Sequence, residues 1–289
     1  MKTNLSKGAI TLRSVLAVIL FSLFLKFDSL FSLMNTLAES GWSLLPIIMV
    51  AVLIRMLFAG SVVLFVLPLC LGCKNWRVWL PTYLRLRRQT ILLGILSFAI
   101  FGILALVIST SLGIFQGNPM TVLAYPDLRP DPDVVGWGYF LLALIPGIWE
   151  ELAFRGLFLS KLRTVFSIRL SILLSALFFA LFHFSNLVTQ SFGQVIFGVI
   201  MAFLFGIGWG FMTVKARSVI PAMISHYLVD SLGQIFLSVD STDPALATMF
   251  FILLTLLFPV FNIVLTKLIY REQVSKEKTV LISKKLGLS

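Results

Sequence analysis

The stretch Trp149-Glu150-Glu151-Leu152-Ala153-Phe154-Arg155-Gly156 places two carboxylates and a guanidinium inside one long apolar segment, residues 136–159. A charge near the middle of a membrane span costs about 2.5–3.5 kcal/mol on insertion scales, so these charges need a reason. On a helix Glu151 and Arg155 share a face, where they can neutralise each other. Glu150 lies about 100° away and has no partner at i+3 or i+4. A desolvated carboxylate of this kind needs a partner on another helix or suits a general base.

The composition indicates a polytopic membrane protein. The 289 residues are 59% hydrophobic, with a mean hydropathy of +1.02, which is far outside the range of soluble domains. The net charge of +11 does not indicate nucleic-acid binding, because the Lys and Arg residues are dispersed among the segments between apolar runs. None of those segments is long enough to bury a core, so we expect no soluble domain.

A helix needs about 20 apolar residues to cross the hydrocarbon core, and this criterion predicts about eight transmembrane helices. The candidate spans are residues 14–34, 44–72, 90–116, 136–159, 170–190, 193–214, 218–238 and 246–270. The segments on either side of the spans alternate in charge. Every second one is rich in Lys and Arg, and the others together contain one basic residue, Arg129. This alternation predicts an all-α fold with the N and C termini in the cytoplasm.

The candidate spans divide the chain into three parts. Residues 1–135 hold the first three transmembrane helices and an outer loop, and residues 136–238 form a helix core that carries the ionisable groups. Residues 239–289 hold the last transmembrane helix and a basic cytoplasmic tail. We expect a multi-pass integral membrane protein of a bacterial cell membrane, in contact with the lipid bilayer and with no nucleic-acid partner.

Small residues within the core predict local departures from a regular helix. Pro146-Gly147 precedes the acidic pair by one turn and predicts a kink there, with space beside Glu150. Four glycines in one span, Gly198, Gly206, Gly208 and Gly210, favour close helix packing over cavity lining.

The two cysteines, Cys70 and Cys73, have no further Cys or His nearby, which favours a reduced pair at the membrane surface over a zinc site.

The chain has two histidines, His183 and His226, and both fall within predicted spans. His226 and Asp230 are four residues apart and therefore project from one helix face. At ~1.5 Å per residue, Glu150, His226, Asp230 and His183 lie about 14, 12, 18 and 20 Å above the inner membrane surface. All four can meet in one polar layer, and ionisable groups inside a membrane typically cluster where they serve one site.

Three motifs occur in order along the core: Glu150-Glu151-x-x-x-Arg155, Phe179-x-x-x-His183 and His226-x-x-x-Asp230. Together they resemble the motifs of the CAAX prenyl protease and bacteriocin-processing family, also called the Abi family of intramembrane proteases. The resemblance covers about residues 136–238. In that family the last motif ends in Asn or Asp, and an anionic Asp230 lacks the donor that Asn would supply.

The resemblance implies a role for each motif residue. Glu150 and His183 would activate a water for attack on a peptide carbonyl. His226 and Asp230 would face the developing oxyanion, and Glu151 with Arg155 would hold the helix.

We therefore expect an enzyme, an intramembrane endopeptidase that cleaves a membrane-associated or lipidated protein or peptide. One alternative is a non-catalytic membrane regulator or bacteriocin-immunity protein of the same family that binds a membrane partner. The retained Glu150 and both histidines weigh against it, because binding alone would not need them. The other alternative is a proton-coupled transporter, which the absence of a convincing internal repeat weighs against.

A metal is the open question of the mechanism. Glu150, His183 and His226 are the alternative zinc ligands, since two histidines and one carboxylate form a catalytic zinc site in metalloproteases. One ion would use both imidazoles, leaving none to assist the water or face the oxyanion. There is also no His-Glu-x-x-His pair. We therefore expect that no cofactor is required, with Zn²⁺ as the alternative.

Overall fold

The computed structural model describes residues 6–25, 36–37, 39–41, 43–72, 80, 83–116, 140–188, 190–232 and 244–270. Helices are the regular secondary structure of these residues, and no strand occurs among them. The predicted outer loop, the basic tail and Cys73 lie outside them, and Cys70 is a free cysteine.

The elements in chain order are α1 (Lys7–Leu25), α3 (Leu44–Ser61), η1 (Val62–Val66), α4 (Leu67–Cys70), α6 (Arg88–Gln116), η2 (Pro146–Glu150), η3 (Leu152–Phe158), α8 (Leu159–Leu162), α9 (Ile168–Phe182), η4 (His183–Val188), α10 (Phe192–Ala216), α11 (Ile220–Ser231) and α13 (Pro244–Ile269). Each of the eight expected spans overlaps a helical stretch of this series. In the described part of the chain, five stretches are long and apolar enough to cross a membrane: Leu45–Cys70, Arg88–Ile114, Ile168–Leu187, Phe192–Ala216 and Thr248–Ile269. The chain is an integral membrane protein.

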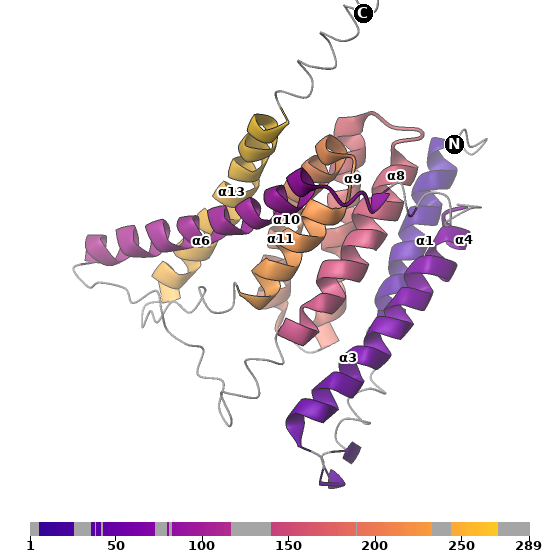
Figure 1. The fold of residues 1–289 in the computed structure, drawn as a ribbon, viewed down its shortest axis with the longest axis horizontal. Coiled ribbons are helices and arrows are strands. Elements are labelled where there is room, and N and C mark those ends of the chain that lie inside the picture. The colour runs from indigo at the N-terminus through magenta and orange to yellow at the C-terminus, as the bar shows by residue number, and fades with distance from the viewer. Residues whose placement is uncertain are drawn as a thin grey trace, which may run out of the picture.

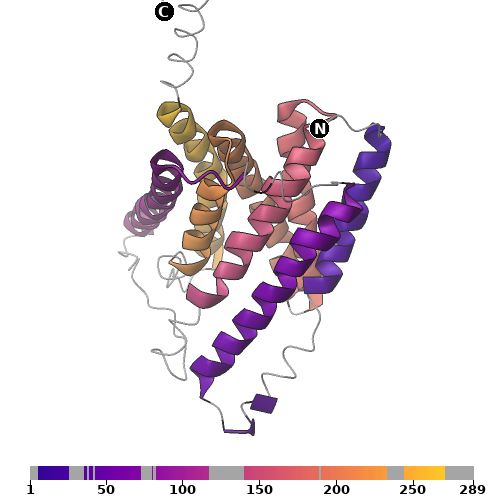
Figure 2. The ribbon, with the colours of Figure 1, turned by 45° about the vertical axis from the view of Figure 1, so that its right-hand side comes forward.

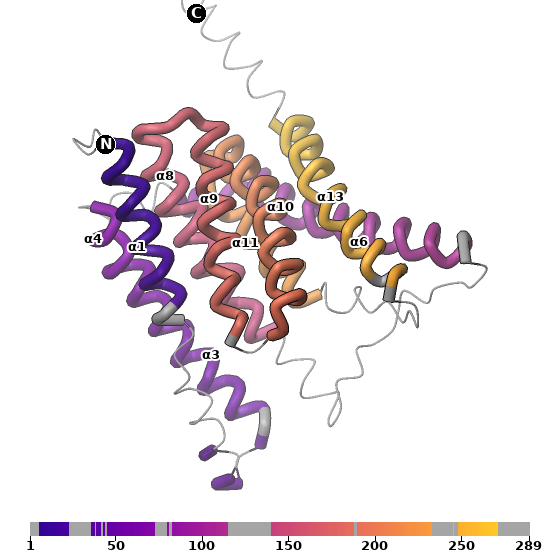
Figure 3. Tube along the Cα trace, turned by 180° about the vertical axis from the view of Figure 1, so that it is seen from behind, coloured from indigo at the N-terminus to yellow at the C-terminus, as the bar shows by residue number. Residues whose placement is uncertain are grey.

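Helices α9, α10 and α11 form the middle of the bundle, with α1 and α3 on one side and α6 and α13 on the other (Figure 1). The same order is visible after a 45° turn (Figure 2) and from behind (Figure 3). The first residues of α1 and the last residues of α13 lie at the same end of the bundle, and α6 lies across the direction of the central helices. That this end faces the cytoplasm remains a prediction, as does the division of the chain into three parts.

Phenylalanine rings fill the space between the central helices. Phe154 of η3 packs against Phe21 of α1 and against Phe179 and Phe182 of α9, with ring centroids 5.2–5.9 Å apart. All four side chains are buried. This cluster anchors the acidic segment of the fourth span to α9.

Glycines set the distance between α10 and its neighbours, as the sequence predicts. A Cβ on Gly206 would lie 3.0 Å from the Cβ of Ala176 in α9, and a Cβ on Gly208 would lie 3.3 Å from the Cα of Pro259 in α13. Gly198 is the exception, because no atom would lie within 4 Å of its Cβ.

The fourth span departs from a regular α-helix where the sequence predicts a kink. Residues 146–150 and 152–158 are π-helical, so their hydrogen bonds skip one residue more than in an α-helix. Pro146 has no N–H to continue an α-helical ladder, and such wide turns occur frequently at functional sites. The acidic pair therefore sits on an unusually wide helix.

The predicted span at 170–190 does not continue as an α-helix to its end. Helix α9 stops at Phe182, and His183–Val188 continue as a 3-10 helix. Side chains compete with the helical ladder at this point, because Ser185 Oγ donates to the Phe182 carbonyl at 2.7 Å. His183 thus lies at the junction of two helix types and not within α9.

Candidate active site

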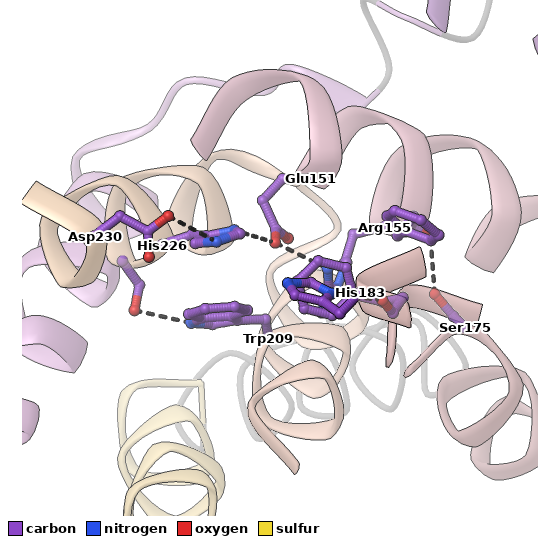
Figure 4. A network of polar contacts seen from close by, with 10 residues as sticks. Glu151, Arg155, Ser175, His183, Trp209, His226 and Asp230 are labelled. Carbon is purple, nitrogen blue, oxygen red and sulfur yellow. Dashed lines mark hydrogen bonds and ion pairs between the residues drawn. The ribbon is translucent and has the colours of Figure 1, made fainter. Parts of the chain in front are cut away.

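Glu151 is the centre of a buried polar network. Its Oε1 accepts a hydrogen bond from Nη1 of Arg155 at 2.9 Å and another from Nδ1 of His226 at 2.8 Å. Glu151 and Arg155 are completely buried. The ion pair between them confirms the expectation from their spacing. The bond to His226 was not foreseen, and it ties the fourth span to α11 (Figure 4).

His226 lies between two carboxylates. Its Nε2 is 3.4 Å from Oδ2 of Asp230, one helical turn further along α11. Because Nδ1 donates to Glu151, Nε2 of a neutral imidazole would be an acceptor that faces another acceptor. A hydrogen on Nε2 as well as on Nδ1 would make this contact favourable. The Asp230 side chain is 36% exposed, whereas that of His226 is 5% exposed.

The Arg155 guanidinium is held by aromatic faces as well as by Glu151. Its Cζ lies 4.1 Å from the ring centroid of Phe179 and 5.5 Å from that of Trp209. Cation–π attraction of this kind is strongest where the cation is desolvated. Gly206 leaves room for the group, since a Cβ there would lie 3.0 Å from Nη2. Nε and Nη2 of Arg155 have no hydrogen-bond partner among the described residues.

Trp209 of α10 is a site residue that the sequence analysis missed. Its ring stacks on the His226 imidazole with centroids 4.3 Å apart and an interplanar angle of 22°. Its Nε1 donates to Oγ of Ser225 at 2.9 Å. The available signal is its position in Gly206-Ile207-Gly208-Trp209-Gly210, where the largest side chain stands among glycines that admit close helix contact.

His183 reaches the network through Phe179. Its Nδ1 lies 2.9 Å from the Phe179 carbonyl, so Nδ1 carries the hydrogen and Nε2 is the nitrogen that can accept a proton. The Phe179 ring makes edge contacts with both imidazoles, at 4.8 Å to His183 and 5.8 Å to His226. His183 is half-buried, which leaves part of the ring accessible.

Glu150 ends η2, next to the network and only half-buried. It lies within electrostatic reach of His226, Asp230, Glu151 and Arg155. Element η2 packs directly on α11, which brings Glu150 to the side of the bundle that carries Asp230. The exposed groups are thus Glu150, Asp230 and His183.

Whether the protein needs a metal stays a prediction. In the described ranges, no group of three or more His, Cys, Asp or Glu side chains is placed to hold one metal ion. Both nitrogens of His226 face carboxylates, so a metal at this imidazole would have to displace Glu151 or Asp230.

Comparison with known protein families identifies the helix core. Residues 132–232 match the family model described as type II CAAX prenyl endopeptidase Rce1-like. This segment is similar to the Rce1-like family. The match confirms the resemblance drawn from the three motifs and contains every candidate residue from Glu150 to Asp230. Neither the curated proteins nor the solved structures give a match. The description of that family is of a prenyl endopeptidase, a class of protease.

Proposed function

We propose that this protein is an intramembrane endopeptidase that hydrolyses a peptide bond of a membrane-associated or lipidated protein with a water activated by Glu150 and His183. The observation that carries the proposal is that one set of the ionisable side chains is buried and another set is partly exposed. Glu151 and Arg155 are fully buried, whereas Glu150, His183 and Asp230 are partly exposed. The buried pair holds the exposed groups where a substrate can reach them.

The reaction follows from the chemistry of the exposed groups. Glu150 accepts a proton from the attacking water while the water oxygen bonds to the peptide carbonyl carbon. The carbonyl oxygen becomes an oxyanion. When this oxygen re-forms the carbonyl, the bond to the amide nitrogen breaks and that nitrogen takes the proton from Glu150. His183, with Nε2 as its accepting nitrogen, assists by accepting a hydrogen bond from the second hydrogen of the water.

A hydrogen on Nε2 of His226 suits oxyanion stabilisation. When the substrate carbonyl oxygen gains charge, Nε2–H of His226 can donate to it in place of Asp230. A donor aimed at an oxyanion contributes roughly 3–4 kcal/mol in other hydrolases. Glu151 keeps the opposite side of the imidazole in place, which preserves the direction of Nε2–H.

The test is a cleavage assay with purified protein in liposomes. The first peptides to offer are farnesylated Cys-a-a-X tails, because the matching family is described as prenyl endopeptidases. Unprenylated tails and leader peptides form the comparison set. We expect cleavage to be lost in Glu150→Gln and retained in Glu39→Gln, a control at an exposed glutamate outside the core. Cleavage of a client by Glu150→Gln at the normal rate would overturn the general-base assignment. Binding of these peptides without hydrolysis would favour a regulator.

A further inference from the structure

We propose that Trp209 is a positioning residue for His226, and that Ser97 of α6 fixes the Trp209 ring through Ser225. The inference rests on the proposed function, in which His226 donates to the oxyanion. It adds two residues outside the three motifs, and one of them lies outside the segment that matches the family.

Polar contacts at the two nitrogens do not fix the plane of an imidazole. The contacts of Nδ1 with Glu151 and of Nε2 with Asp230 hold two atoms of the His226 ring, but the ring can still tilt about the line that joins them. Stacking on Trp209 removes this freedom, because two buried rings 4.3 Å apart and 22° from parallel restrict each other's plane. Trp209 is 2% exposed and His226 is 4% exposed, so no water competes for this contact.

The Trp209 ring is itself oriented by a chain of two hydroxyls. Indole Nε1 can only donate, and it donates to Ser225 Oγ at 2.9 Å. Ser225 Oγ lies 2.7 Å from Ser97 Oγ, and both serines are completely buried. Since Ser225 directly precedes His226, the indole is fixed to the same turn of α11 as the imidazole that it covers.

The serine pair depends on close contact between α6 and α11. A Cβ on Gly94, one turn before Ser97, would lie 2.7 Å from the Cβ of Ile224. Gly94 therefore allows the two helices to approach until the hydroxyls meet. Helix α6 precedes the matched segment, so part of the support for His226 comes from outside residues 132–232.

The consequence for catalysis concerns the direction in which Nε2–H of His226 points. Hydrogen bonds weaken as the donor angle departs from linearity, and catalytic groups work only within about 10–20° of the productive geometry. Tilting the imidazole would misdirect Nε2–H while leaving substrate binding intact. The expected signature is a lower kcat with an unchanged KM.

The experiment uses nuclear magnetic resonance and kinetics on the same variants of the full chain. With two histidines in the sequence, isotope-labelled histidine gives two ring signals, and the His183→Gln protein assigns the one from His226. A stacked indole shifts imidazole ring protons upfield, so the His226 signal reports the stack without any need for activity. The variants are Trp209→Leu, Trp209→Phe, Ser97→Ala and Ser97→Thr. Ser109→Ala is the control, because Ser109 is also buried in α6 but bonds within its own helix to Leu106.

We expect Trp209→Leu to abolish the upfield shift and Ser97→Ala to reduce it, with Ser97→Thr close to wild type. In kinetics, Ser97→Ala should lower kcat about 3- to 10-fold, the loss that corresponds to one hydrogen bond, with KM unchanged. If Trp209→Leu does not fold, Trp209→Phe and Ser97→Ala still decide the matter, because each leaves a ring on His226.

An unshifted His226 signal in wild type, or equal effects of Ser97→Ala and Ser109→Ala, would overturn the inference. So would a normal kcat in a Ser97→Ala protein whose His226 signal has moved. If no peptide is cleaved by wild type while the signals behave as expected, the positioning stands and it is the proposed function that fails.

Discussion

Gly147 lies against the backbone of Tyr227, so closely that a Cβ on Gly147 would be 2.8 Å from the Tyr227 Cβ and 3.0 Å from its Cα. Tyr227 follows His226 directly, and the acidic pair begins three residues after Gly147. The one contact therefore sets how near the carboxylates come to the imidazole on α11.

Gly147→Ala should separate η2 from α11 and weaken the bond between Glu151 and His226. Overpacking at such a contact costs about 1–3 kcal/mol of unfolding free energy. We expect a lower midpoint in detergent unfolding and at least about a tenfold loss of cleavage, since small displacements at a reacting centre are costly. Gly198→Ala is the matched control, because its Cβ would meet no atom within 4 Å. Equal behaviour of the two variants would contradict the backbone contact.

Helix α9 carries two buried serines, one with a hydrogen-bonded hydroxyl and one whose hydroxyl has no partner among the described residues. Ser175 Oγ donates to the Phe154 carbonyl at 2.7 Å, whereas Ser171 Oγ is buried with no partner among the described residues. Ser175→Ala should destabilise the protein by about 0.5–1.5 kcal/mol, because it removes one buried hydrogen bond while the Phe154 carbonyl keeps its bond from the Leu159 N–H. Ser171→Ala should be neutral or stabilising. Unfolding midpoints of the two variants check the order, and the reverse order would remove Ser175 from the support of η3.

Arg155→Ala should lower the amount of folded protein in the membrane. It removes one of the two donors to Glu151 and the cation that faces Phe179. Breaking a buried ion pair costs about 3–5 kcal/mol, and we expect a loss toward the low end because His226 still donates to Glu151. Arg163→Ala, at an exposed arginine eight residues on, should leave abundance unchanged. Membrane fractions of the two variants give the measurement, and normal abundance of Arg155→Ala would contradict the structural role.

Asp230→Asn tests whether an anion is needed beside His226. The amide keeps an acceptor for Nε2 and adds a donor toward a developing oxyanion. We expect cleavage at or above the wild-type rate in Asp230→Asn and a loss of about tenfold or more in Asp230→Leu. Inactivity of both variants in a folded protein would show that the charge of Asp230 itself takes part.

Zinc should be absent from purified, active protein, and prolonged chelation should leave most activity intact. The physical reason is that His226 already uses both nitrogens toward Glu151 and Asp230. Elemental analysis and a chelation series measure this. About one zinc per chain, with activity lost on chelation and restored by zinc, would favour metalloprotease chemistry at the same residues.

The five spans found in the described part of the chain were predictable, because a membrane forces each crossing to satisfy its backbone within its own segment. The pairing of Glu151 with Arg155 was predictable for a similar reason, since i,i+4 contacts depend only on local geometry. The bond from His226 to Glu151 could not be predicted, because it depends on how each of two helices is rotated about its own axis. The stack of Trp209 on His226 was missed for the same reason, since no sequence period reports which aromatic faces a given imidazole.

The wide turns of residues 146–158 also constrain how this sequence can change in length. A π-helical turn contains one residue more than the α-helical turn that would replace it. Deleting one residue between Pro146 and Glu150 would therefore restore an ordinary helix at little cost to the backbone. The narrower turn would take up the missing residue, so Glu150 and Glu151 would keep their direction toward α11 while the wide turn beside them would be lost. This segment thus accepts the loss of one residue in a way that a regular α-helix does not, since there each deletion turns the residues beyond it by about 100°.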